Sequence, residues 1–142
     1  MSHLDDDPEA AAKKHGQVCV YPGAHELFVD IDCQEDRDWL DEQLAVLSKM
    51  NFELEVVREI PSKSGGARCH VYLHSPRELS NMDRIALQAC LGSDRRRELL
   101  SIMRTFLKVG RAPTIFFEKP ENAPSPVVIA PPKSTKEPEF DF

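Results

Sequence analysis

Two short stretches decide the fold: LFVDID (residues 27–32) and SGGARCHVY (residues 64–72). The first is an apolar run that ends in alternating carboxylates, which is typical of a strand. The second is a Gly-rich turn followed by alternating apolar and polar residues, which indicates a turn that leads into another strand. The sequence therefore predicts two strands, one with acidic side chains at its end and one with a histidine among its polar positions.

Outward from these stretches, the hydrophobic periodicity alternates between strand and helix. The predicted elements are a strand at 25–32, a helix at 34–50, strands at 52–60 and 67–74, helices at 80–91 and 93–108, and a strand at 113–118. The order is β-α-β-β-α-β, with the second helix broken at Gly92. This is the ferredoxin-like or RRM-like α+β pattern, an antiparallel sheet with helices on one face and the first and third strands as neighbours.

The composition divides the 142-residue chain into three parts. Residues 1–16 are polar and rich in Ala and Lys, which indicates a flexible N-terminal arm. Residues 17–119 carry the predicted elements and form one RRM-like α+β domain. Residues 120–142 hold six of the eleven prolines, which predicts a disordered tail with an acidic-aromatic end.

The net charge of −6 argues against a general nucleic-acid coat. Residues 84–111 nevertheless hold seven basic and two acidic residues, a local net charge of +5 in a chain whose remainder carries −11. Such a patch suits a specific anionic ligand, or it is a solvated helix face. The four cysteines are scattered, and no apolar run approaches the length of a membrane span. The sequence therefore predicts a cytoplasmic protein with no membrane partner.

One face of the predicted sheet concentrates polar and aromatic side chains. If Leu27, Val29 and Ile31 face the helices, the alternation of a strand sends the residues between them outward. The residues predicted to face outward on the two neighbouring strands are Phe28, Asp30, Asp32, Arg68, His70, Tyr72 and His74. An ordinary solvated sheet face is richer in Thr, Lys and Glu, so this convergence predicts a binding or catalytic surface.

The residue types on this face suggest metal and phosphate chemistry. Asp30 and Asp32 can share a Mg²⁺ or Mn²⁺ ion, which takes its other ligands from water and substrate phosphates. Asp32 alternatively caps the helix that follows. The Ser64-Gly65-Gly66 turn can bring backbone N–H groups to a phosphate, or it is a plain hairpin loop. His70 is a candidate ligand or phosphate contact, or a structural histidine.

The last predicted helix carries Arg97, Arg104 and Lys108 at steps of seven and four residues, which places them on one face. This stripe is a candidate phosphate-binding surface or the wet side of an amphipathic helix. The opposite, buried side is predicted to hold Leu99, Met103 and Phe106.

The pair of stretches, Phe28-Val29-Asp30-Ile31-Asp32 and Ser64-Gly65-Gly66-Ala67-Arg68-Cys69-His70, resembles the first two motifs of the archaeo-eukaryotic primase superfamily, which includes primase-polymerases. The resemblance implies an RRM-like palm in which Asp30 and Asp32 hold Mg²⁺ or Mn²⁺. It also implies that His70 and Ser64 contact a nucleoside triphosphate. In that family a third acidic motif lies on a later strand, and here Glu118 is the residue available. The short unit also suits a reduced or degenerate relative, such as one from a phage or mobile element.

The segment Glu137-Pro138-Glu139-Phe140-Asp141-Phe142 resembles the acidic, Phe-ending tails of bacterial and phage single-stranded-DNA-binding proteins. The resemblance implies that residues 137–142 bind a replication-protein partner. A solubilising tail is the alternative.

Three hypotheses follow. The chain is a metal-dependent nucleotidyltransferase with Asp30, Asp32 and His70 as catalytic residues and Ser64, Gly65, Gly66, Arg68 and His70 around the phosphates. Alternatively, it is a non-catalytic module in which Phe28 and Tyr72 stack bases and Arg97, Arg104 and Lys108 bind the backbone of a single strand. The third hypothesis is a protein-interaction adaptor that acts through its tail.

Overall fold

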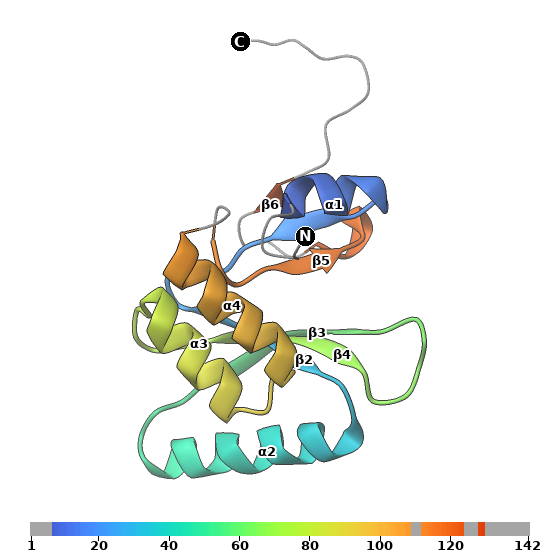
Figure 1. The fold of residues 1–142 in the computed structure, drawn as a ribbon. Helices are drawn as coiled ribbons and strands as arrows, with labels where there is room; N and C mark the ends of the chain where they lie inside the picture. Colours follow the sequence, from blue (N-terminus) through green and yellow to red (C-terminus); the bar gives the residue numbers. More distant parts are fainter. Residues whose placement is uncertain (1–6, 109–111, 124–127, 130–142) are drawn as a thin grey trace.

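A computed structural model describes residues 7–108, 112–123 and 128–129. The described part is an α+β structure with four helices and two small antiparallel sheets (Figure 1). The helices are α1 (Pro8–Lys14), α2 (Gln34–Lys49), α3 (Asn81–Cys90) and α4 (Arg95–Leu107). The strands are β1 (Val18–Val20), β2 (Glu26–Ile31), β3 (Glu55–Pro61), β4 (Cys69–His74), β5 (Phe116–Glu118) and β6 (Val128–Ile129), and a 3₁₀ turn covers Pro120–Asn122.

The central sheet has the order β2-β4-β3. The predicted neighbours, the strand that carries Asp30 and the strand that carries His70, are therefore paired, and Asp30 lies directly opposite His70 in the register. The prediction of a single four-stranded sheet differs from the structure at the last strand. β5 does not join β2 but pairs with β1 in a second sheet of order β5-β1-β6.

Apolar residues on both faces of the central sheet explain the layers. Leu27, Val29 and Ile31 are fully buried against α2, where Leu40 is also fully buried. On the other face, Phe28 packs with Val18, Val20, Tyr72 and Phe116 of the two sheets. Figure 1 accordingly shows the central sheet between α2 on one side and the second sheet with α1 on the other.

This second layer corrects the prediction of an open sheet face. Phe28 is fully buried and Tyr72 is 2% exposed, so neither presents a ring to solvent. The ring centroids of Phe28 and Phe116 lie 4.9 Å apart in a stacked pair, and Tyr72 meets Phe28 edge-on at 4.8 Å. The two aromatic side chains that were predicted to stack bases instead form the core between the sheets, because β1 and β5 cover them.

The chain flanking the predicted domain also contributes elements. Residues 8–14, within the predicted flexible arm, form α1, whose Ala12 is buried against the second sheet together with Cys19 and Tyr21. Residues 128–129, within the predicted tail, form β6 and pair with β1. The predicted partner-binding segment 137–142 lies outside the described residues.

The outer edge of β2, where a ferredoxin-like fold has another strand, is closed mainly by side chains of α3 and of the start of α4. Arg84 donates to the carbonyl oxygen of Glu26, and Gln88 Oε1 accepts from the N–H of Phe28 at 2.8 Å. The remaining three bonds are Arg97 to Phe28 O, Asp30 N–H to Ser93 Oγ and the Asp94 N–H to Asp30 O. Since an unpaired buried backbone group is costly, these bonds explain how β2 lies inside the molecule without a second strand partner.

Gly92 makes the sharp connection between α3 and α4. Its φ of +93° is a conformation that other residues rarely adopt, and a Cβ there would lie 3.1 Å from the Trp39 ring. The predicted break at Gly92 is confirmed, although the second helix begins at Arg95, with Asp94 as its N-cap, and not at residue 93. The hairpin therefore depends on a glycine both for its backbone angle and for its contact with α2.

In α4, the buried face differs from the predicted one. Glu98 and Ser101 are 2% and 1% exposed, whereas Leu99 and Phe106 are 60% and 65% exposed. The physical reason is the edge of β2, whose backbone groups require polar partners, so α4 turns its polar side inward.

No helix among the described residues is both long enough and apolar enough to traverse a bilayer. All four cysteines are free.

Candidate functional site

The structure brings two of the sequence-predicted residues, Asp30 and Glu118, around His70. Nδ1 of His70 lies 2.8 Å from Oε2 of Glu118, and its Nε2 lies 3.9 Å from Oδ1 of Asp30. The His70 ring stacks on Phe116 with centroids 3.9 Å apart. β2, β4 and β5 thus each contribute one polar group to the same place, which joins the central sheet to the second sheet.

Glu118 orients His70. Its side chain is only 5% exposed, and Oε2 accepts hydrogen bonds from both His70 and the hydroxyl of Tyr72. Burial and the bond to Glu118 raise the pKa of Tyr72, so its hydroxyl remains a donor. With a carboxylate as its partner, Nδ1 of His70 acts as the donor, and Nε2 faces Asp30.

This environment also shifts the pKa of Asp30. Burial raises the pKa of its carboxyl group, an effect that Arg97 and His70 reduce and that Asp94 and Asp32 increase. Both backbone groups of Asp30 are hydrogen-bonded. Its N–H donates to Ser93 Oγ at 3.0 Å, and its carbonyl oxygen accepts from the N–H of Asp94. A carboxylate held rigidly in a partly desolvated site is a common feature of functional sites.

Asp30→Asn is expected to stabilise the fold at pH 7. A folded-state pKa above the unfolded value means that the contribution of Asp30 to stability is complete below the unfolded pKa and is lost as pH rises through the folded pKa. The charged carboxylate therefore penalises the native state at pH 7, and a neutral amide in its place removes that penalty. Thermal melting at pH 4 and pH 7 checks this: the gain in Tm should be larger at pH 7.

Asp41→Asn is the matched control, because Asp41 is 60% exposed on α2. It should show no such gain at either pH. A drop in Tm for Asp30→Asn at pH 7 would contradict the reasoning, since it would mean that the ionised carboxylate stabilises the fold.

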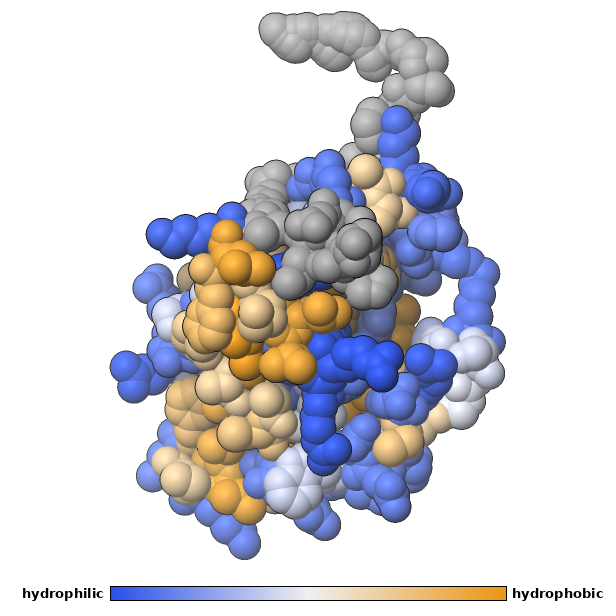
Figure 2. All heavy atoms as spheres, viewed as in Figure 1, coloured by the Kyte–Doolittle hydropathy of each residue, from blue (hydrophilic) through white to orange (hydrophobic). Residues whose placement is uncertain are grey.

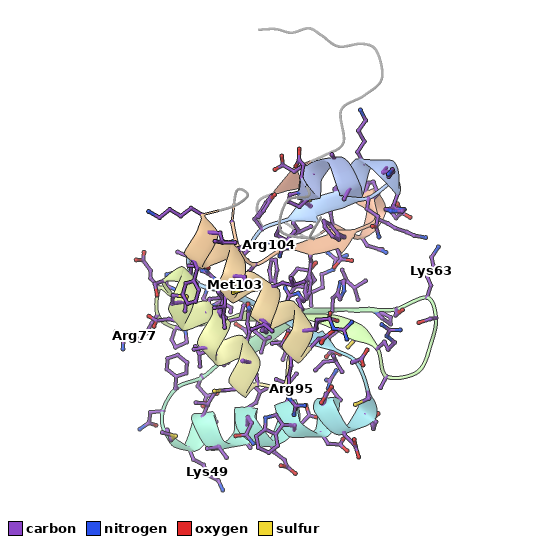
Figure 3. All side chains as sticks on the ribbon, in the orientation of Figure 1. Lys49, Lys63, Arg77, Arg95, Met103 and Arg104 are labelled. Atoms are coloured by element: carbon purple, nitrogen blue, oxygen red, sulfur yellow. The ribbon has the colours of Figure 1, made fainter. Side chains whose placement is uncertain are left out.

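Two cavities meet at Asp30 and His70. The first has a volume of about 330 Å³, and its cationic lining residues are Lys63, Arg68 and Lys119. The second, of about 410 Å³, is lined by Arg97 and Arg104 together with apolar side chains of α4 and β5. Both also include Gln17 and Phe117. Figure 3 shows Lys63 on the turn at one end of this region and Arg104 on α4 at the other.

The other predicted residues are only partly brought together. Asp32 is exposed, forms an ion pair with Arg68 at 3.3 Å, and lines a different cavity from Asp30. It does not cap α2, because Cys33 is the residue at that position. In the turn, Ser62 and Lys63 line the first cavity, whereas Ser64, Gly65 and Gly66 do not. Both glycines have positive φ angles, as a tight turn requires.

The predicted basic stripe of Arg97, Arg104 and Lys108 is not a uniform surface. Arg97 is largely buried, donates to Glu98 at 2.5 Å and lies over the Phe116 ring at 4.4 Å. Arg104 is half-buried beside the second cavity, and burial, followed by the repulsion of Arg97, lowers its pKa. Lys108 is the exposed C-cap of α4 in a left-handed conformation and lines neither cavity.

The sequence missed a buried polar network that supports the site. Gln88 Nε2 donates to Glu98 Oε1 at 2.9 Å, and Ser93 Oγ donates to Glu98 Oε2 at 2.7 Å. Together with Arg97, these side chains hold the backbone of Phe28 and Asp30. The spacing shows that Arg97, Ser101 and Arg104 share one side of α4 and that Leu99 and Phe106 share the other, but it does not show which side is buried.

The side chains around His70 could hold a divalent cation only if most of its ligands came from water or a bound molecule. Among the described residues, no group of three or more His, Cys, Asp or Glu side chains is arranged to hold a metal ion. Asp30 presents a carboxylate to both cavities, and Asp32 follows two residues later. Magnesium commonly binds to one or two carboxylates and completes its shell with water and substrate phosphates. The residues therefore fit an ion that arrives with a phosphate-bearing ligand.

The chain was also compared with known proteins. No protein-family model, no curated protein and no solved structure matches it. Similarity thus assigns no family, and the function has to be argued from the geometry around His70.

Proposed function

We propose that the chain is a primase-like palm that binds a nucleoside triphosphate with Mg²⁺ or Mn²⁺ and transfers the nucleotidyl group. The observation that carries the proposal is the first cavity, where Asp30, His70 and Glu118 lie beside Lys63, Arg68 and Lys119. A cleft with acidic groups and an imidazole at one side and cations at its rim suits a ligand that carries both phosphates and a metal ion.

The topology supports the same proposal. β2, α2, β3, β4 and the α3–α4 hairpin follow the order of an RRM-like core, with the predicted first and third strands paired. In this proposal the palm departs from the ferredoxin-like arrangement at its last strand, and Glu118 on β5 reaches His70 from the second sheet. Glu118 thereby takes the place of the third acidic residue that the resemblance implies.

The roles follow from position and charge. Asp30 would hold the metal ion, whose other ligands would come from water and the phosphates, and the ion would neutralise charge on the phosphates. His70, oriented by Glu118, contacts the triphosphate, and Lys63, Arg68 and Lys119 neutralise it at the rim. In the transfer, a 3′-hydroxyl oxygen bonds to the α-phosphorus, the bond to the bridging oxygen of the β-phosphate breaks, pyrophosphate leaves, and the hydroxyl proton passes to solvent.

The second cavity suits the strand that supplies this hydroxyl. It shares Asp30 and His70 with the first cavity, and it combines Arg97 and Arg104 with the apolar side chains of Leu100 and Phe117. Cationic and apolar groups side by side match the phosphate and the base of a single strand. In this proposal nucleic-acid binding therefore involves Arg97 and Arg104 but not the buried Phe28 and Tyr72.

Calorimetry with Mn²⁺ and a nucleoside triphosphate tests the proposal. The wild type should bind the nucleotide only when Mn²⁺ is present, and Asp30→Asn should weaken this binding at least tenfold, about 1.4 kcal/mol. The matched control is Glu42→Gln, an acid-to-amide change at a solvent-accessible position on α2, which should bind like the wild type. Equal binding by Asp30→Asn, or no binding by the wild type at millimolar nucleotide, would refute the proposed site.

A further inference from the structure

The outer face of α4 is apolar where it meets solvent. We define this outer face by Arg95, Arg96, Leu99, Met103, Phe106 and Leu107. Leu99, Phe106 and Leu107 are 60%, 65% and 53% exposed. Figure 2 shows apolar side chains gathered over α3 and α4, with hydrophilic ones beside them, and Figure 3 places Met103 and Arg95 along α4. Contiguous exposed apolar surface of this kind marks interaction sites.

The exposure of this face is a consequence of the fold. The opposite side of α4 is occupied by Glu98, Ser101 and Arg97, which are needed at the edge of β2 and near β5. The apolar residues then have no place in the core. At the start of the helix, Arg95 and Arg96 are exposed and add positive charge to one end of the face.

An occupant that combines apolar groups with negative charge would match this face. Such a segment exists in the chain itself: Glu137-Pro138-Glu139-Phe140-Asp141-Phe142. In an extended peptide, alternate side chains point to opposite sides. Phe140 and Phe142 would then share one side of the segment, and the acidic residues flank them along its length.

The segment is long enough to reach the helix. Thirteen residues follow Ile129, the last residue that the structure describes. Fully extended, thirteen residues span about 43 Å. The seven residues 130–136 connect Ile129 to the docking segment and span about 23 Å when extended, which exceeds the radius of gyration of about 13 Å expected for a folded unit of about 100 residues.

We propose that residues 137–142 dock on the outer face of α4 of the same chain. Phe140 and Phe142 cover Leu99, Met103 and Phe106, and the acidic residues lie toward Arg95 and Arg96. The segment and the outer face of α4 are complementary in charge as well as in apolar area, because the segment is acidic and the face carries two arginines. This docking does not depend on the nucleotide site, and a partner that takes the segment would expose α4.

Amide NMR spectra of the full-length protein test the docking. Phe140→Ser/Phe142→Ser should shift the amide signals of Arg95–Leu107 and leave those of α2 unchanged. Phe106→Ser in the wild type should cause the same change, because it removes the apolar contact at a position that the fold does not bury. Val57→Ser, a 54% exposed apolar position on β3, is the matched control and should leave α4 unaffected.

Charge reversal gives an independent arm. Arg95→Glu/Arg96→Glu should undock the segment, and adding Glu137→Lys/Glu139→Lys should restore the wild-type α4 signals. Acidic residues in the first turn of a helix are compatible with its dipole, so the reversal itself should not unfold α4. A repeat at high salt should weaken the docking, since exposed charges are then screened.

Other outcomes overturn the proposal. Unchanged α4 signals in Phe140→Ser/Phe142→Ser would show that the segment does not dock there. Signals that shift on dilution, together with a dimer in light scattering, would assign the face to a second copy and not to the same chain. If the charge swap on both the helix and the segment failed to restore docking, the acidic residues would not lie toward Arg95 and Arg96 as proposed.

Discussion

Glu98→Ala is expected to lower the free energy of unfolding by about 3–5 kcal/mol, because it leaves the buried Arg97 without its counter-charge. Glu98 is 2% exposed and accepts hydrogen bonds from Gln88, Ser93 and Arg97. Its removal also loosens the side chains that satisfy the backbone of Phe28. Urea denaturation at pH 7 measures the loss.

Two variants show whether the cost belongs to this network. Glu42→Ala changes a solvent-accessible acid on α2 and should stay within about 0.5 kcal/mol of the wild type. Glu98→Gln keeps the shape of the side chain and should cost less than Glu98→Ala. A loss below about 1 kcal/mol for Glu98→Ala would mean that the pair with Arg97 contributes little to the fold.

Phe28→Ala is expected to cost a similar amount, about 3–5 kcal/mol, because it opens a cavity between the two sheets. Phe28 is fully buried and stacks on Phe116, which in turn supports the ring of His70. The variant should therefore also disturb the orientation of His70. Thermal or urea unfolding, read by circular dichroism, gives the stability change.

Val46→Ala is the comparison, since Val46 is an apolar residue on α2 that is 48% exposed and lies outside the outer face of α4. Its substitution should change the free energy of unfolding by less than about 0.5 kcal/mol. If the Phe28 and Val46 variants were equally stable, the second sheet would not cover the central sheet as described.

The local elements were predictable from the sequence because they depend on local signals. The alternation in LFVDID and CHVYLH predicted β2 and β4, and their predicted pairing is confirmed down to Asp30 opposite His70. The helix predicted at 80–91 is confirmed as α3, and it begins where the hydroxyl of Ser80 accepts from the N–H of Asp83. These features need only neighbouring residues or a strand alternation, which a single sequence carries.

The second sheet was not predictable in the same way. β1 has three residues, too short for a clear period, whereas β5 lies within the predicted strand at 113–118 but pairs with β1 from a distant part of the chain. The open face was predicted because nothing in the LFVDID and SGGARCHVY stretches indicates a covering layer. The predicted alternation of side chains was correct. The error was that the second sheet covers this face, so that Phe28 and Tyr72 face a core and not solvent.

The candidate site was predicted in part. Asp30 and His70 meet as the strand order requires, whereas Glu118 reaches them only because β5 belongs to the second sheet. For α4, the positions of the apolar residues predicted the wrong buried face. Polar side chains of α4 face inward instead, because the backbone of β2 needs hydrogen-bond partners. A tertiary demand of this kind is not written in the helix itself.

The side chains that close β2 also affect how the central sheet resists association. An exposed strand edge is a template for aggregation, and proteins usually protect it with charge, proline or a covering element. On the β2 side, an added strand would first have to displace the hydrogen bonds from Gln88, Ser93 and Arg97. On the β3 side, the protection is Arg58, Glu59 and Pro61. At the β2 edge the backbone groups already have hydrogen-bond partners, and at the β3 edge charged side chains and a proline disfavour pairing with another strand. Neither edge therefore needs a further strand.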